Sequence, residues 1–249
     1  MSDNYINSII KGFKVLELFD RRNNLLGITE ISQMLSYPIS TTFRIVSTLE
    51  HCGYLRQDLA SNKYCLGIQN YKIGLNVNFI NELKRISYEH MKALSYDYNE
   101  VTHLAVLDND KVLCIQKISV NRALSATPEE GETNYAHATS AGKCMFAYTS
   151  DNVVEGFLQN NQLIKLTENT ITEKNLFLNE LKRIREDGCA VDHEESEIGL
   201  TCVGAPIFDS QNKCVAAISI SVPNARLNSN LEQLKNGIKI IAKKISLQL

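Results

Sequence analysis

Residues 137–148, HATSAGKCMFAY, bring together the side chains of this sequence that could most readily do chemistry. A histidine, a serine, a Gly-Lys pair and a cysteine fall within twelve residues. Three uses are compatible with such a segment: a phosphate-binding loop, a nucleophilic serine at a sharp turn, and a ligand pocket at the start of a helix. The neighbouring residues distinguish among them.

A phosphate-binding loop has the pattern Gly-x-x-x-x-Gly-Lys-[Ser/Thr], in which the backbone wraps the phosphates and the final hydroxyl binds Mg²⁺. Gly142 and Lys143 fit this pattern. However, His137 stands at the first glycine position and Cys144 at the hydroxyl position. The phosphate loop is therefore rejected.

A nucleophilic serine would use Ser140 in a relaxed Gly-x-Ser-x-Gly turn, with Ala138 in place of the first glycine. Such a turn follows a buried strand, whereas the preceding residues 131–137, GETNYAH, are not a buried apolar strand. The only later histidine, His193, lies in an acidic run and is not set apart from a triad acid. We expect no hydrolase chemistry and no enzymatic activity.

The acidic run at residues 192–197, DHEESE, lacks the His-Glu-x-x-His spacing of a zinc site. The seven cysteines are odd in number and include no Cys-x-x-Cys pair, which indicates neither a zinc cage nor a disulfide framework. We therefore expect no metal and no cofactor, and we interpret the acidic run as a solvated turn.

A ligand pocket fits the opening segment best. The small residues Ser140, Ala141 and Gly142 at a helix start leave backbone N–H groups open to the carboxylate of a small metabolite. Ser219 and Ser221 lie two residues apart in the apolar run CVAAISISVP, so both point to one side of a sheet. Because buried hydroxyls need partners, these serines favour a shared cavity.

The elements that must position these residues form an α+β pattern. The sequence becomes extended at residues 101–118, around an Asp-Asn-Asp turn, and is polar and irregular at residues 119–136. Helices are predicted at residues 138–149, 151–160 and 172–188, then strands at 189–195, 199–210 and 213–222, and a closing helix at 227–249. This order predicts one mixed or antiparallel sheet with helices packed on it.

The first part of the chain predicts a helix-turn-helix with a wing. A helix at residues 6–19 with one buried stripe precedes a short helix capped at Thr29, and the pair Tyr37-Pro38 ends that helix. A second short helix and a hairpin up to residue 66 follow. The residues expected to face inward from the two short helices are Ile31, Met34, Leu35, Phe43, Val46 and Leu49.

The outward face of the second short helix carries Ser40, Thr41, Arg44 and Ser47. Hydroxyls and an arginine are groups that bond phosphates and base edges in the major groove of DNA. The hairpin adds Arg56 and Lys63, which a wing could offer to the DNA backbone or to the minor groove, and the pattern predicts a DNA-binding module.

Charge bears on how such a module would bind. The chain of 249 residues has a formal net charge of −2, and residues 1–66 carry seven Lys and Arg against six Asp and Glu, a net of +1. One such module is weakly basic, so binding is expected to use two copies on two half-sites, in a homodimer or homotetramer. No leader peptide and no membrane-spanning run is evident, and we expect a cytoplasmic protein.

The sequence resembles the IclR family of bacterial transcriptional regulators over residues 6–245. The segments that carry the resemblance are, in order, SIIKGFKVLELF, TEISQMLSYPISTTFRIVSTLEHCGYL, KYCLG, HATSAGK, GCAVDHEESEIGLTCVGAPIFD and AAISISVP. The resemblance implies a winged helix-turn-helix at residues 1–67, a linker helix at 68–78 and a GAF-like effector-binding domain at 79–249.

The resemblance also implies roles for individual residues. Ser40, Thr41, Thr42 and Arg44 would lie on the recognition helix, with Arg56 and Lys63 on the wing. The effector cavity would be lined by Ser140, Ala141, Asp192, Cys202, Ser219 and Ser221. Effectors of the family are small organic, sugar or aromatic acids.

Three residues depart from the family pattern: Ile39 replaces a lysine, Cys65 an arginine and Val222 a glycine. The first two remove expected phosphate contacts, so DNA binding would depend more on Arg44 and the wing. The predicted function is a ligand-responsive regulator that binds a double-stranded operator, as a repressor of a catabolic operon controlled by a small anionic effector. The alternative is a sensor or enzyme whose N-terminal module serves only for docking.

Overall fold

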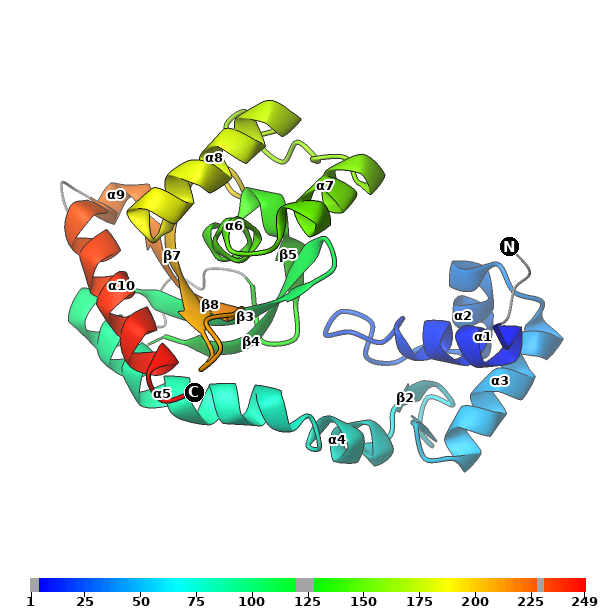
Figure 1. The fold of residues 1–249 in the computed structure, drawn as a ribbon. Coiled ribbons are helices and arrows are strands. Elements are labelled where there is room, and N and C mark those ends of the chain that lie inside the picture. Colours follow the sequence, from blue (N-terminus) through cyan, green and yellow to red (C-terminus); the bar gives the residue numbers. More distant parts are fainter. Residues whose placement is uncertain (1–4, 120–127, 228–230) are drawn as a thin grey trace. The chain divides into compact units, whose positions relative to one another are not determined.

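The computed structural model describes residues 5–119, 128–227 and 231–249 (Figure 1). The chain divides into two compact units, Met1–Asn78 and Phe79–Leu249. The first unit is a winged helix-turn-helix and the second an α+β domain, so the predicted fold class is confirmed.

The first unit holds three helices against a short hairpin. Helices α1 (Asn7–Leu16), α2 (Ile28–Leu35) and α3 (Ile39–His51) precede strands β1 (Leu55–Gln57) and β2 (Tyr64–Leu66), which pair antiparallel, and α4 (Ile68–Gly74) follows. Gly53, just after α3, has a φ of +78°, a conformation that favours glycine and turns the chain into the wing. The small core includes Val15, Ile31, Val46 and Leu55.

The start of α2 differs from the prediction. Thr29 was expected to cap this helix, but α2 begins at Ile28 and Gly27 is the capping residue. The Oε2 atom of Glu30 accepts the N–H of Gly27 at 2.6 Å, which fixes the first turn. A glutamate three residues after the cap is the sequence signal that could have located this end.

Three predictions of inward-facing residues are wrong. Met34 is 49% exposed and Phe43 is 54% exposed, although both were expected to face inward. Ile31 and Val46 face the core as predicted, and Thr42 faces it as well. The third is the first part of the stripe expected in the first helix, because Ile6, Ile9, Ile10 and Phe13 are exposed in the single chain. The rest of that stripe, Leu16 and Leu18 or Phe19, packs on the core as expected.

The second unit is built on an antiparallel sheet of order β5-β4-β3-β8-β7-β6. Its strands are β3 (Val101–Asp108), β4 (Lys111–Ile118), β5 (Thr133–Tyr135), β6 (Ala190–His193), β7 (Leu200–Phe208) and β8 (Cys214–Pro223). The hairpin β3-β4 turns through Asn109, which has a positive φ, as the Asp-Asn-Asp signal predicted.

Helices cover both faces of this sheet (Figure 1). Helix α5 (Asn78–Tyr98) and α10 (Leu231–Ser246) pack on one face through residues such as Leu94 and Ile238. The other face carries the 3-10 turn η1 (Ala136–Ala138), α6 (Ser140–Ala147), α7 (Asp151–Asn160) and α8 (Lys174–Asp187). A short helix, α9 (Asn224–Leu227), follows β8.

Some predicted boundaries in this unit change. Helix α8 begins at Lys174 with Glu173 as its cap, so the predicted cap Thr172 is wrong, whereas Gly188 ends the helix in the left-handed conformation as expected. The predicted irregular segment 119–136 contains strand β5, and its residues 120–127 lie outside the described residues. Of the predicted closing helix, residues 228–230 lie outside them as well.

Two glycines allow α6 to lie close to its neighbours. A Cβ atom on Gly142 would lie 2.1 Å from the carbonyl oxygen of Ala136, and one on Gly204 of β7 would lie 2.8 Å from the carbonyl carbon of Ser140. Neither distance is possible for a real side chain against backbone. The N-terminus of α6 is therefore held directly against η1 and the sheet, and all eight residues of α6 are buried.

Candidate effector cavity and DNA-binding surface

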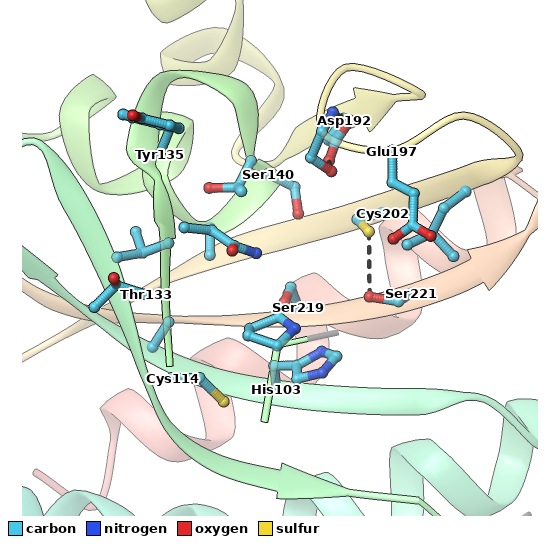
Figure 2. Close-up of a pocket in the computed structure, with 18 of the residues that line it drawn as sticks. His103, Cys114, Thr133, Tyr135, Ser140, Asp192, Glu197, Cys202, Ser219 and Ser221 are labelled. Carbon is cyan, nitrogen blue, oxygen red and sulfur yellow. Dashed lines mark hydrogen bonds between the residues drawn. The ribbon is translucent and has the colours of Figure 1, made fainter. Parts of the chain in front are cut away.

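A cavity of about 310 Å³ opens between the start of α6 and the sheet (Figure 2). All six residues predicted to contact an effector line it: Ser140, Ala141, Asp192, Cys202, Ser219 and Ser221. They come from α6, β6, β7 and β8, so the six residues meet only because α6 packs on the sheet. The volume is at the small end of the range for ligand pockets, ~300–1,000 Å³.

The N-terminus of α6 presents donors to this cavity. Thr139 caps the helix, and its Oγ1 accepts the N–H of Gly142 at 3.2 Å. The N–H groups of Ser140 and Ala141 belong to the first turn, where a helix offers no backbone acceptor. An anionic group of a ligand can therefore accept from these two groups and from the positive end of the helix dipole.

Hydroxyl and thiol groups form the floor. Ser219 and Ser221 on β8 point to the cavity, and the Cys202 Sγ lies 3.1 Å from the Ser221 Oγ (Figure 2). Burial raises the pKa of the Cys202 thiol well above its usual range, so the thiol stays protonated and donates to Ser221. Burial also raises the pKa of Cys114, another lining residue, to about 12. These thiols are packing and hydrogen-bonding groups rather than nucleophiles.

Asp192 is buried, and its oxygens organise the loop after β6. Oδ1 accepts the N–H of Glu195 at 2.7 Å and of Ser196 at 3.3 Å, and Oδ2 accepts the Ser196 hydroxyl at 2.5 Å. Burial raises the pKa of Asp192, against the effect of these hydrogen bonds. The interpretation of residues 192–197 as a solvated turn is therefore wrong for Asp192 and Glu195, which are both buried.

Lys143 explains how these carboxylates are accommodated. Its side chain is 0% exposed and points away from the cavity, and its Nζ donates to the Val191 carbonyl at 2.7 Å. The same ammonium pairs with Glu195 and, at 3.4 Å, with Glu180 of α8. His137 is structural too: it is buried, and its Nε2 lies 3.0 Å from the carbonyl oxygen of Ile164. Neither residue lines the cavity.

Several lining residues were not predicted from the sequence. They include His103 on β3, Lys111 on β4, Asn134 and Tyr135 on β5, and Ser196 and Glu197 on the loop after β6. Strand β5 lies in a segment with no extended period, so nothing in the sequence indicated that it pairs with β4. The alternation in the β3-β4 hairpin could have pointed to His103, which pairs in register with Ser219.

The predicted DNA-contacting residues lie on α3 and the hairpin. Ser40 and Arg44 are exposed on α3, and Thr41 and Ser47 are half-buried. On the wing Arg56 is exposed, while Lys63 is half-buried and its Nζ lies 2.8 Å from Glu30 Oε1. Part of the charge of Lys63 is therefore already balanced within the unit.

Thr42 is a correction to the predicted DNA-binding set. Its side chain is 0% exposed, and its hydroxyl donates to the Pro38 carbonyl at 3.2 Å. Thr42 and Val46 are four residues apart and share the core-facing side of α3. Thr42 therefore packs α3 against the core of the unit, and its buried side chain is not accessible to DNA.

A polypeptide that combines a DNA-binding helix-turn-helix with a ligand-binding α+β domain is a one-component transcriptional regulator. The chain belongs to the IclR family: residues 80–247 match the family described as bacterial transcriptional regulator IclR C-terminal, and residues 8–59 match the IclR helix-turn-helix domain. The members are regulators of transcription, which places this chain outside the enzymes.

Individual relatives agree with this assignment. The HTH-type transcriptional regulator KdgR of Escherichia coli K12 is 31% identical over 245 residues, covering 98% of this chain and 93% of the relative. The transcriptional repressor IclR of the same organism is 28% identical over 227 residues, covering 90% and 83%. An IclR homolog from Microbacterium hydrocarbonoxydans, solved with 4-hydroxybenzoate, has the same fold at 23% identity, with a TM-score of 0.87 and 97% and 98% of the chains covered.

Within residues 5–119, 128–227 and 231–249, no group of three or more His, Cys, Asp or Glu is placed to hold a metal ion. Among the helices described, none combines the length and the apolar character that a membrane crossing requires.

Proposed function

We propose that this chain is a ligand-controlled repressor of a catabolic operon and that a small carboxylic or sugar acid is its effector. Residues 1–67 would bind the operator, residues 68–78 would connect the domains, and residues 79–249 would bind the effector. The main support is the cavity: six residues from four elements converge on a space of small-metabolite size. Its first helical turn offers backbone donors to a carboxylate.

DNA contact is assigned to α3 and the wing. Arg44 is an exposed arginine on the outward face of α3, flanked by the hydroxyls of Ser40, Thr41 and Ser47. An arginine on a recognition helix can pair with guanine or with phosphate oxygens. Arg56 on the wing adds a contact to the backbone.

A homodimer or homotetramer is part of the proposal. Exposed apolar residues include Ile6, which precedes α1, and Ile9 and Phe13 within it, and Ile68 and Tyr71 are exposed on α4. Apolar faces of this kind are costly in water and mark contact surfaces. Two DNA-binding units, each on one half-site of the operator, would also double the weak positive charge that attracts one unit to DNA.

The effector assignment draws on relatives only as support. One protein of the same fold was solved with 4-hydroxybenzoate, a small carboxylate, and a relative at 28% identity is named a repressor. We assign this chain the same sense of regulation, with release from the operator when an acid fills the cavity. Cytoplasmic localisation follows from operator binding.

The test is a fluorescence-anisotropy titration with labelled fragments of the DNA upstream of this gene and its neighbours. The wild type should bind one fragment selectively, and Arg44→Ala should weaken that binding at least tenfold, whereas Lys92→Ala, on α5 of the second unit, should not. Unchanged binding of Arg44→Ala would remove α3 as the recognition helix. Absence of selective binding to any fragment would favour the alternative of a sensor whose first unit only docks.

The proposed binding of an effector is tested by a thermal-shift screen of small carboxylic acids. A ligand at about 100 times its dissociation constant adds ~2.7 kcal/mol to stability, which is easily detected. A compound that stabilises the protein should also release it from DNA. Ser219→Ala and Ser221→Ala should weaken that response and leave basal DNA binding unchanged; normal responses in both variants would place the effector elsewhere.

A further inference from the structure

Two large apolar side chains are exposed on α3, the helix assigned to DNA contact. Ile39 is 58% exposed and Phe43 is 54% exposed. They lie four residues apart, so they are neighbours on the surface of the helix. The side of α3 that faces the core carries Thr42 and Val46 instead, which are both 0% exposed. Ile39 and Phe43 therefore form an apolar patch that the folding of the first unit leaves uncovered.

The polar groups assigned to DNA surround this apolar patch. Ser40 lies three residues before Phe43 and Ser47 four residues after it, which places both beside Phe43 on the helix surface. Arg44 follows Phe43 directly and is exposed. A protein partner with an apolar surface would cover the patch but leave the hydroxyls of Ser40 and Ser47 without hydrogen-bond partners, at a cost in free energy. This side of α3 therefore fits a partner that offers apolar and hydrogen-bonding groups together.

The major groove of DNA offers this combination. Its base edges present hydrogen-bond donors and acceptors, and thymine alone of the four bases also presents a methyl group. Arginine pairs with guanine, hydroxyls bond several base edges, and apolar side chains, phenylalanine among them, contact the thymine methyl group. Arg44, Ser40 and Ser47 can supply the polar contacts, and the apolar patch matches the methyl group.

The position and spacing of the apolar patch limit which base pairs it can reach. Ile39 is the first residue of α3, and the N-terminal residues of a recognition helix are the ones that contact base edges. Four residues of an α-helix rise about 6 Å along its axis, and successive base pairs of DNA are ~3.4 Å apart. Ile39 and Phe43 can therefore contact base pairs that are about two steps apart.

We infer that Ile39 and Phe43 bind thymine methyl groups in the major groove, so that each half-site of the operator carries one or two thymines where these side chains contact it. The inference rests on the proposed binding of the operator by α3. The two residues are determinants of sequence specificity, because they favour thymine over bases that lack the methyl group. Burying one methyl group corresponds to about a fourfold gain in affinity.

Removing methyl groups from the DNA tests this inference without altering the protein. The fragment that binds selectively in the anisotropy titration is synthesised as a set of duplexes, each with one thymine replaced by deoxyuridine, which lacks the 5-methyl group and keeps the base pair. The wild type should bind about fourfold more weakly when one of one or two thymines in each half-site is replaced. These thymines should lie no more than about two base-pair steps apart. If no replacement changes the affinity by twofold or more, the inference is overturned.

Variants assign the effect to the apolar patch. In Phe43→Ala, and separately in Ile39→Ala, the loss on deoxyuridine replacement should disappear at the thymine that the missing side chain contacts. Ile240→Ala is the matched control, since it removes a side chain of similar exposure, 56%, from α10 of the second unit. It should show the full loss. A patch variant that binds the thymine and deoxyuridine duplexes with the same ratio as the wild type would show that its side chain only positions α3.

The salt dependence of binding gives an independent measurement. Phe43→Ala removes no charge, so the slope of the logarithm of the binding constant against the logarithm of the salt concentration should stay unchanged. Arg56→Ala on the wing should reduce the magnitude of that slope by about one if it removes one phosphate contact. A reduced slope in Phe43→Ala would mean that the variant has shifted α3 away from the phosphates, against the inference.

The outcomes keep this inference apart from the proposed function. If no DNA fragment is bound selectively, operator binding itself fails, and the inference fails with it. If Arg44→Ala weakens the binding of a fragment that is insensitive to deoxyuridine, the recognition helix stands and the contact with thymine is wrong. If Phe43→Ala lowers the oligomeric state in sedimentation and keeps the deoxyuridine loss, the patch is a contact between copies of the chain, and the inference is wrong.

Discussion

The ammonium of Lys143 on α6 lies 2.7 Å from the carbonyl oxygen of Val191 on β6. This bond joins the helix whose first turn lines the cavity to the strand that carries Asp192, and the same ammonium pairs with Glu195 and Glu180. The wall of the cavity is therefore held by a buried lysine that itself does not reach the cavity. The Gly-Lys pair of the opening segment thus has a structural use.

Removing this lysine should be costly. Lys143→Met leaves the carboxylate of Glu195 buried without its cation, whereas Glu180 keeps its ion pair with Arg183, and breaking a buried pair in this way costs ~3–5 kcal/mol. Urea unfolding followed by circular dichroism should show this loss in the second unit. Lys174→Met, at an exposed position of α8, should change stability by less than ~0.5 kcal/mol.

The double variant Lys143→Met/Glu195→Gln distinguishes charge from packing. If the cost of the single variant arises from uncompensated carboxylates, removing one of them should recover about 1–2 kcal/mol. A double variant that is less stable than either single one would show that volume and shape at Lys143 matter more than its charge.

The stability of the second unit should depend on pH in an unusual direction through Asp192. Burial raises the pKa of Asp192 above its usual 3.8, although Ser196 and Glu195 donate to the carboxylate. Between the two pKa values the folded state binds the proton more readily, so stability falls as pH rises through the folded pKa and is greatest below 3.8.

The comparison with Asp192→Asn tests this direction. Because the charge of Asp192 also raises the pKa of Glu195, the difference between the two proteins includes the coupling of these two carboxylates. As the pH is lowered from 7 toward 4, the free energy of unfolding of the wild type should rise relative to that of the variant. Urea unfolding at a series of pH values measures the difference. A difference that falls on acidification would mean that hydrogen bonds to the carboxylate outweigh its burial.

Gly142 should not tolerate even a methyl group. A Cβ atom there would meet the Ala136 carbonyl oxygen at 2.1 Å, so Gly142→Ala must displace α6 from η1, at a cost of about 1–3 kcal/mol or more. Gly156 in α7 is the matched control, because nothing lies within 4 Å of its Cβ position. Gly156→Ala should stabilise the protein by ~0.5–1 kcal/mol, since alanine is the better helix former. Two equal melting temperatures would contradict the close approach.

Neighbouring threonines on α3 should behave differently. Thr42→Val keeps the buried shape and removes a hydroxyl that donates to Pro38, so it should cost ~1 kcal/mol of stability and change operator affinity less than twofold. Thr41→Ala should leave stability nearly unchanged and weaken operator binding severalfold. Melting curves and anisotropy on the same two variants test both halves, and a reversed pattern would mean that α3 is rotated about its axis.

The sequence alone determined most of the elements and their order, with strand β5 as an exception. The spacing of apolar residues and the positions of turn-forming residues were sufficient to predict the helix-turn-helix, the β3-β4 hairpin and the end of α8 at Gly188, because these signals are local. The failed pattern around Gly142 and Lys143 was also enough to reject a phosphate loop. Residues such as Ser219 and Ser221 were predictable because alternation along one strand fixes their common face.

Tertiary structure decided which of these residues meet and which are covered. Thr42 and Asp192 are polar residues that the sequence pattern predicts to be available to a partner, yet both are buried. Thr42 lies on the core-facing side of α3, and Asp192 accepts hydrogen bonds from the loop that follows it. Tyr135 reaches the cavity wall because β5, which has no periodic signal, pairs with β4. Burial and long-range pairing depend on the whole chain, and no local pattern of residues records them.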